Sequence, residues 1–143
     1  MLDVWVTLCT RVMVDTNTNL LSLIDLVDKL DVSVAPEGAR VPLPTQLAVV
    51  ARWRRDDSEG PVVIRQRIVF RRSDGPALVT FEPQDISLER NHLGVIITHV
   101  PMIVLEGYGQ YRFDVERLVG EQWGGVAWTG LFIEQASLGR PAP

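Results

Sequence analysis

The sequence predicts an all-β fold, a single antiparallel β-sandwich of about 7 to 9 strands. Three observations lead to this prediction. Apolar and polar residues alternate with a period of two over several stretches, turn-forming residues separate those stretches, and the length of 143 residues suits one domain. We expect at most short helical turns, one sandwich domain over residues 1–135, and a flexible C-terminal tail over residues 136–143.

The clearest strand lies within residues 106–119, EGYGQYRFDVERLV. After a glycine-rich turn, Tyr111, Phe113 and Val115 alternate with polar and charged residues, so one face of this strand is apolar. A tyrosine at such a position, followed two residues later by an apolar side chain, is typical of the corner of immunoglobulin-like sandwiches, where the tyrosine fixes the preceding turn. We therefore expect an immunoglobulin-like or C2-like sandwich arranged around this strand.

Two long strands are predicted in the middle of the chain, at residues 46–54 and 62–72. Each places apolar residues at every second position, and the linker DDSEGP between them supplies turn-forming residues. The sequence thus predicts a hairpin whose two strands carry their arginines on the same side of one sheet. Trp53 shares its face with Leu47, Val49 and Ala51 and is expected in the core.

The other elements follow from the same criteria. Strands are predicted at residues 2–8, 77–81, 92–105 and 126–135. Residues 82–91 could hold one helical turn that opens at Pro83, and residues 120–125 are expected to form a turn around Trp123. Residues 92–105 are expected to form one strand or two, broken at Pro101, which cannot donate to a ladder and so indicates an edge strand or a bend.

The segment of residues 20–34, LLSLIDLVDKLDVSV, is ambiguous. Leu20, Leu23, Ile24, Val27 and Leu30 fall at helical spacing with polar residues opposite. Alternation along the same segment is poor, because both faces of a strand would mix apolar and charged residues. The pattern alone favours a helix.

The net charge of −4 conceals a basic region. Residues 52–72 contain seven arginines and three acidic residues, a local net charge of +4, and Lys29 is the only lysine of the chain. This preference for arginine either reflects genome composition or provides guanidinium groups for bidentate pairing. Because the chain is acidic overall and no aromatic residues suited to base stacking interleave with the arginines, nucleic acid is not expected as a partner.

The predicted hairpin would set like charges against each other. Arg52 and Arg54 would lie across from Arg65 and Arg67, which is unfavourable by a few tenths to about 1 kcal/mol per directly opposed pair. Acidic groups should therefore lie beside these arginines. They are either Asp114 and Glu116, if the strand of residues 106–119 is a neighbour, or the side chains of an acidic partner.

No constellation for catalysis is apparent in the sequence. His92 and His99 are seven residues apart, so on one strand they point to opposite faces, and Cys9 is expected to be a buried structural thiol. Closely spaced Cys and His ligands for zinc are absent from the sequence, and residues 15–19 copy only the first half of a calcium loop. We expect no enzyme, no catalytic residue, no cofactor and no metal.

The sequence also bears on location. A single cysteine excludes an internal disulfide and fits a reducing compartment. The N-terminus lacks the basic segment of a secretory signal, and the longest apolar stretch, residues 93–105, is shorter than the roughly 20 residues that span a bilayer. We expect a cytoplasmic protein that does not enter a membrane.

The order of these pieces resembles a widespread bacterial family of small stand-alone β-sandwich proteins, known only as a domain of unknown function. The matching positions are Cys9, Leu21 to Leu26, Pro42 to Thr45, Asp74 with Gly75, and Gly109 with Tyr111. The resemblance covers roughly residues 3 to 135 and implies that residues 20–32 form a strand, against the helical spacing. It implies no activity.

Two functions remain open on the sequence alone. The first is a non-enzymatic domain that binds a protein partner or itself through a sheet face or the edge near Pro101, with Arg52, Arg54, Arg65 and Arg67 as partner-binding residues. The second is a small-ligand or carbohydrate-binding module that works from the loops of residues 73–91 and from those near Trp123, the tryptophan expected to be accessible. Trp123 could instead cover one end of the sandwich.

Overall fold

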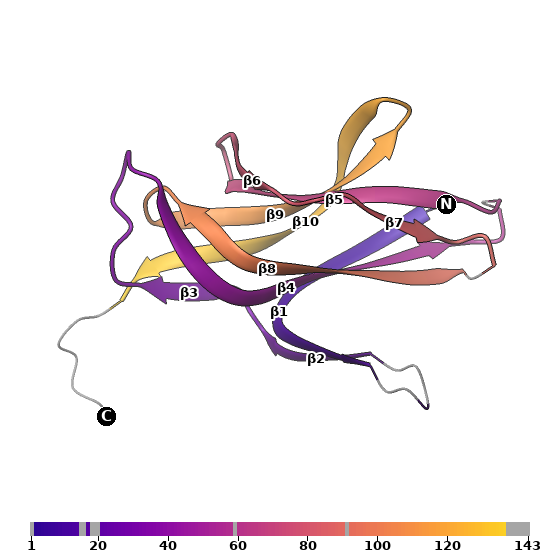
Figure 1. Cartoon of the computed structure of the whole chain (residues 1–143), viewed down its shortest axis with the longest axis horizontal. Coiled ribbons are helices and arrows are strands. Elements are labelled where there is room, and N and C mark those ends of the chain that lie inside the picture. The colour runs from indigo at the N-terminus through magenta and orange to yellow at the C-terminus, as the bar shows by residue number, and fades with distance from the viewer. Residues whose placement is uncertain (1, 15–16, 18–20, 59, 91, 137–143) are drawn as a thin grey trace.

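The computed structural model of the protein describes residues 2–14, 17, 21–58, 60–90 and 92–136 (Figure 1). These residues contain ten strands and no helix, which confirms the predicted all-β class. The strands form two sheets, in which all pairings are antiparallel except one. The strand count is slightly higher than predicted.

The first sheet, sheet A, has four strands. Their order across the sheet is β2 (Leu21–Leu26), β1 (Leu2–Val14), β4 (Val41–Arg55) and β8 (Leu93–Leu105). The second, sheet B, has the order β3 (Lys29–Val32), β10 (Gln122–Gln135), β9 (Gly109–Val119), β5 (Val63–Arg72) and β6 (Ala77–Thr80), and β7 (Gln84–Ser87) also pairs with β5. The parallel pair is β3 with β10.

Residues from both sheets form one large buried cluster. The predicted inward residues of β4 are buried, and Trp53 is only 1% exposed. Opposite them, Ile64, Ile68 and Phe70 of β5 are buried too. Between the two strands, Trp53 Nε1 donates to Gln66 Oε1 at 2.7 Å, so the polar atom of the largest core side chain has a partner, as buried polar groups require.

The tyrosine corner predicted at the start of residues 106–119 is confirmed. The Tyr111 hydroxyl donates to the carbonyl of Gly107 at 2.7 Å and accepts from the amide of Glu106 at 2.8 Å. Gly107 has a φ of 86°, a conformation that glycine adopts readily. Phe113, two residues after the tyrosine, is fully buried.

The predicted hairpin of residues 46–54 and 62–72 is wrong in its pairing. The two strands exist as β4 and β5, but β4 pairs with β1 and β8, whereas β5 pairs with β9, β6 and β7. The linker between them therefore joins the two sheets. Both strands have one strongly apolar face, and placing the strands in different sheets buries those two faces against each other, as sandwich packing does.

The ambiguous segment of residues 20–34 forms strands in its described part. The family resemblance implied a strand here, whereas the helical spacing favoured a helix. β2 belongs to sheet A and β3 to sheet B, while residue 20 lies outside the described part. The chain passes between the sheets at Val27 and Asp28, whose amide and carbonyl bond to Leu8 and Phe132. This change of sheet explains the poor alternation, since the inward direction changes within the segment.

Three smaller expectations are corrected. Residues 82–91 contain the strand β7 in place of a helical turn at Pro83. Strand β10 begins at Gln122, so Trp123 lies in a strand and not in a loop. β8 is continuous through Pro101, which does lie on an edge strand of sheet A. The expected tail beyond Ala136 and most of the calcium-like turn fall outside the described residues.

The far ends of β1 and β2 form an arm that bends away from the main sheet (Figure 1). The ladder between β1 and β4 ends at Cys9, and Thr10 Oγ1 then donates to the Ile24 carbonyl at 3.1 Å. Asp25 has a φ of 54°, a left-handed conformation that aspartate tolerates better than most residues. The arm and the outer face of sheet A share a second apolar cluster. Its buried members are Cys9, Ala48 and Val50, and Val12, Leu21, Leu23 and Ile97 pack against them.

Candidate functional site

The four arginines expected to face a partner lie on two different surfaces. Arg52 and Arg54 alternate with the buried residues of β4 and so lie on the outer face of sheet A. Arg65 and Arg67 lie on the outer face of sheet B for the same reason. The predicted opposition of these like charges does not occur, because β4 and β5 are not neighbours.

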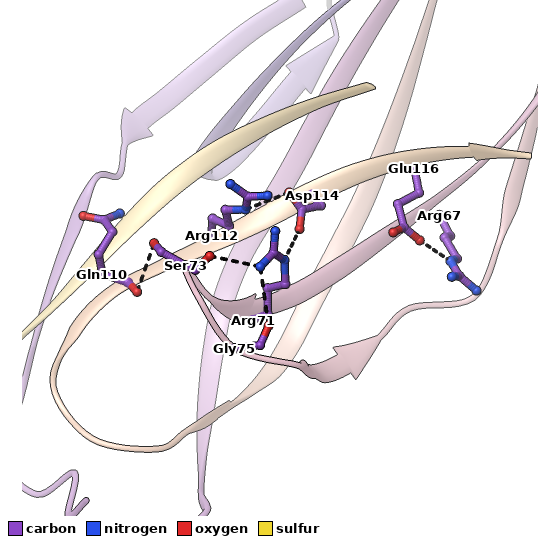
Figure 2. Close-up of polar contacts among 8 residues, drawn as sticks. All are labelled: Arg67, Arg71, Ser73, Gly75, Gln110, Arg112, Asp114 and Glu116. Atoms are coloured by element: carbon purple, nitrogen blue, oxygen red, sulfur yellow. Dashed lines mark hydrogen bonds and ion pairs between the residues drawn. The ribbon is translucent and has the colours of Figure 1, made fainter. Parts of the chain in front are cut away.

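On sheet B the arginines are paired within the chain (Figure 2). Arg67 is directly cross-strand from Glu116 and its Nε donates to Oε1 at 2.6 Å. Arg71 Nε donates to Asp114 Oδ2 at 2.6 Å, and Arg112 Nε lies 3.0 Å from the other oxygen. The expectation that Asp114 and Glu116 interleave with arginines is confirmed.

The pairing on sheet B is extensive. Arg71 also donates to the carbonyls of Ser73 and Gly75, at 3.0 and 3.4 Å (Figure 2). Arg65 lies 3.6 Å from Asp85 of β7. Asp114 is only 7% exposed and is shared by two guanidinium groups. Charge-assisted hydrogen bonds such as those of Arg67 and Arg71 are about twice as strong as neutral ones, so these two arginines need no partner from outside the chain.

Aromatic rings cover part of the same surface. The guanidinium carbon of Arg67 lies 4.5 Å from the ring centroid of Trp123, and that of Arg112 lies 5.3 Å from that of Trp128. Trp123 is half-buried, so the expectation of an accessible loop tryptophan is wrong. Sequence reasoning missed Trp128, which is 56% exposed.

The outer face of sheet A differs. Cross-strand rows place Arg52 between Trp5 and Val95, and Arg54 between Asp3 and Leu93. Of these, Trp5, Leu93 and Val95 are exposed by 52%, 46% and 37%. We call Trp5, Arg52, Leu93 and Val95 the Trp–Arg patch. Its signal in the sequence was Trp5 at a polar-face position of the first strand.

The charges of this face are only partly paired. Arg54 Nη2 lies 2.9 Å from Asp3 Oδ2, in a pair exposed to solvent. Arg52 forms no ion pair with any residue that the structure describes. A hollow of about 390 Å³ lies against the patch, lined by Asp3, Val4, Trp5, Arg52, Arg54 and Leu93.

The cysteine and the histidines do not meet. Cys9 is fully buried, its Sγ lies 3.7 Å from the Ala48 carbonyl, and burial raises the pKa of the thiol. His99 lies in the same cross-strand row, but β4 stands between, which separates the two by about two spacings of 4.8 Å. His92 lies elsewhere, with Nδ1 3.3 Å from the Arg55 carbonyl. The predicted burial of Cys9 is confirmed.

Within the described residues, no three His, Cys, Asp or Glu side chains gather closely enough to hold a metal ion. The described part of the chain also has no helix of the length and apolarity that crossing a bilayer demands. Comparison with known proteins finds no protein-family model and no curated protein that matches the chain.

Proposed function

We propose that this protein is a non-enzymatic interaction domain that binds a protein partner through the outer face of sheet A. The observation that carries the proposal is the Trp–Arg patch, in which exposed apolar side chains surround a guanidinium group with no ion pair among the described residues. We further propose that the fold is an immunoglobulin-like β-sandwich. The shared core of the two sheets and the tyrosine corner support this reading.

The composition of the patch suits protein binding. Tryptophan and arginine are enriched at the energetic centres of protein interfaces, because each buries a large area and also offers a polar group. Trp5 and Leu93 border the hollow, which can receive an apolar anchor from a partner. An acidic residue beside that anchor would pair with Arg52, so the partner surface we expect is apolar and acidic.

The other surfaces are less suited. On the outer face of sheet B, Arg67, Arg71 and Arg112 each form an ion pair within the chain. Along the β8 edge, Pro101 lacks an N–H for strand addition, and the Gln84 side chain donates to the Ile97 carbonyl at 3.3 Å. Arg67 covers the ring of Trp123, which does not favour the carbohydrate-binding alternative. Arg65, Arg67 and Trp123 are therefore left out of the proposed interface.

The test compares two tryptophans of nearly equal exposure on opposite surfaces, Trp5 and Trp128. Proteins that co-purify with the chain from its native host are expressed alone, and their affinity for each variant is measured by calorimetry. Trp5→Ala should weaken binding by about tenfold or more, while Trp128→Ala should bind as the native chain does. Equal affinities for the two variants would place the interface elsewhere.

A further inference from the structure

A groove opens where β1 and β4 part. β1 pairs with β4 only as far as Cys9, opposite Ala48. The earlier residues of β4 therefore have β8 on one side and no described strand on the other. Strand β3 of sheet B borders the same gap. The resulting groove measures about 560 Å³ and is lined by Thr10, Leu30, Asp31, Val32, Ser33, Val34, Leu43, Pro44, Thr45, Gln46 and Leu47.

The floor of the groove is the main core itself. Val32 and Leu47 are buried members of the large cluster, and Leu30 and Leu43 pack against it. Val34, at the rim, is 65% exposed. A concave site of this size with mostly apolar walls is typical of small-molecule binding.

The two threonine hydroxyls inside the groove have no hydrogen to offer a ligand. Thr10 donates its hydroxyl hydrogen to the Ile24 carbonyl, and Thr45 donates its own to the Val100 carbonyl. Pro44 has no backbone N–H. A ligand that needed donors along its length would lose hydrogen bonds to water without replacement, so the interior favours a chain without polar atoms.

Proline also disfavours a peptide in the groove. A strand that pairs with β4 at this edge needs backbone donors, but prolines occupy positions 42 and 44 of β4, and Pro44 lines the groove. A hydrocarbon chain has no such need.

The groove is held open by packing on the other side of the point where β1 stops pairing with β4. The arm of β1 and β2 is fixed to the outer face of sheet A by the second apolar cluster around Cys9, Ala48 and Val50. Closing the groove would require this cluster to open and expose its residues to water. The cavity is therefore a built feature of the fold.

We propose that this groove binds the aliphatic chain of a single-chain amphiphile whose uncharged, hydroxyl-bearing head lies at the rim. The rim carries Asp31, Ser33 and Gln46, all exposed. The carboxylate of Asp31 accepts hydrogen bonds from hydroxyl groups and repels a fatty-acid carboxylate, although Lys29, 3.6 Å from Asp31, offsets part of its charge. This site is separate from the Trp–Arg patch.

Binding of the fluorescent probe N-phenyl-1-naphthylamine to the full chain, and its displacement, tests the proposal. Monoacylglycerols should displace the probe, with affinity rising about fourfold for each added methylene, and fatty acids of equal chain length should compete more weakly. Val34→Glu should reduce probe and monoacylglycerol affinity by about tenfold. Val119→Glu, a change at a residue of the same 65% exposure, should leave both unchanged.

Several outcomes would overturn the proposal. They are failure of the native chain to bind the probe, equal affinities of the Val34→Glu and Val119→Glu variants, an affinity independent of chain length, and equal competition by fatty acids. Displacement by an extended apolar peptide but not by monoacylglycerol would also overturn it. Trp5→Ala should bind the probe as the native chain does, so the result is independent of the proposed protein interface.

Discussion

The outer faces of the two sheets carry similar residues and use them differently. Both combine tryptophan with arginine, but on sheet B each arginine near a ring also has a carboxylate, as Arg67 has Glu116 and Arg112 has Asp114. On sheet A, Arg52 lies beside Trp5 without one. Arginine content alone therefore does not identify a binding face, whereas an arginine without an ion-pair partner in the chain is informative.

The largest expected effect is on stability, at Asp114. Asp114→Asn removes the charge that Arg71 and Arg112 share at a site only 7% exposed, and breaking a buried ion pair costs about 3 kcal/mol or more. We expect a loss of about 2 to 3 kcal/mol of unfolding free energy, since both arginines keep some solvent contact. Urea denaturation measures the loss.

The matched control lies on sheet A. Asp3→Asn breaks the Asp3–Arg54 pair, which is exposed to solvent, and should cost less than about 1 kcal/mol. A cost as large as that of Asp114→Asn would contradict the distinction between the faces.

A second comparison reverses the charge of one arginine on each face. Arg67→Glu places two carboxylates opposite each other, because Arg67 is cross-strand from Glu116, and should cost about 1 to 2 kcal/mol of unfolding free energy. Arg52→Glu meets no such neighbour and should change stability by less than about 0.5 kcal/mol.

Binding should show the opposite order. Arg52→Glu should abolish association with the partner recovered from the host, while Arg67→Glu, once folded, should retain it. Calorimetric titration of both variants measures this. A loss of stability in Arg52→Glu would show that Arg52 belongs to an internal network after all.

The smallest expected effect concerns the covered part of sheet A, beneath the arm. Burial raises the pKa of the Cys9 thiol, so the folded chain holds the neutral thiol where the unfolded chain already loses its proton. The contribution of the neutral thiol to the free energy of unfolding should therefore be fully present below the ordinary thiol pKa of about 8.5 and should fall as pH rises above it. The difference in unfolding free energy between the native chain and the Cys9→Ala chain should shrink as pH rises through this range. A constant difference would mean that the thiol is not desolvated.

The sequence predicted side-chain faces better than strand neighbours. Alternation located the buried face of β4, and the Tyr111 spacing located the corner, because both depend on residues close together in the chain. Prediction from the sequence failed where strand pairing depends on segments that are far apart in the chain. The same alternation fits β4 and β5 paired in one sheet or stacked in two, and the leucine spacing of residues 20–30 resembled a helix because the segment changes sheets.

The sequence predicted some residues of the candidate sites and missed others. Asp114 and Glu116 were expected to pair with arginines if their strand were a neighbour, and they do so, although the opposed like charges that suggested it do not occur. The isolation of Arg52 and the groove beside Pro44 depend on which strands are absent from a neighbourhood, and local patterning contains no such information.

The parallel pair of β3 and β10 joins residues more than a hundred positions apart, Lys29 with Phe132 for example. Contacts of this sequence separation form slowly, since a long loop must close first. A nascent chain therefore has to wait for its last strand before β3 can dock, and the newly emerged N-terminal half keeps an unpaired edge throughout translation. That edge stays open to non-native strand pairing until β10 has been made.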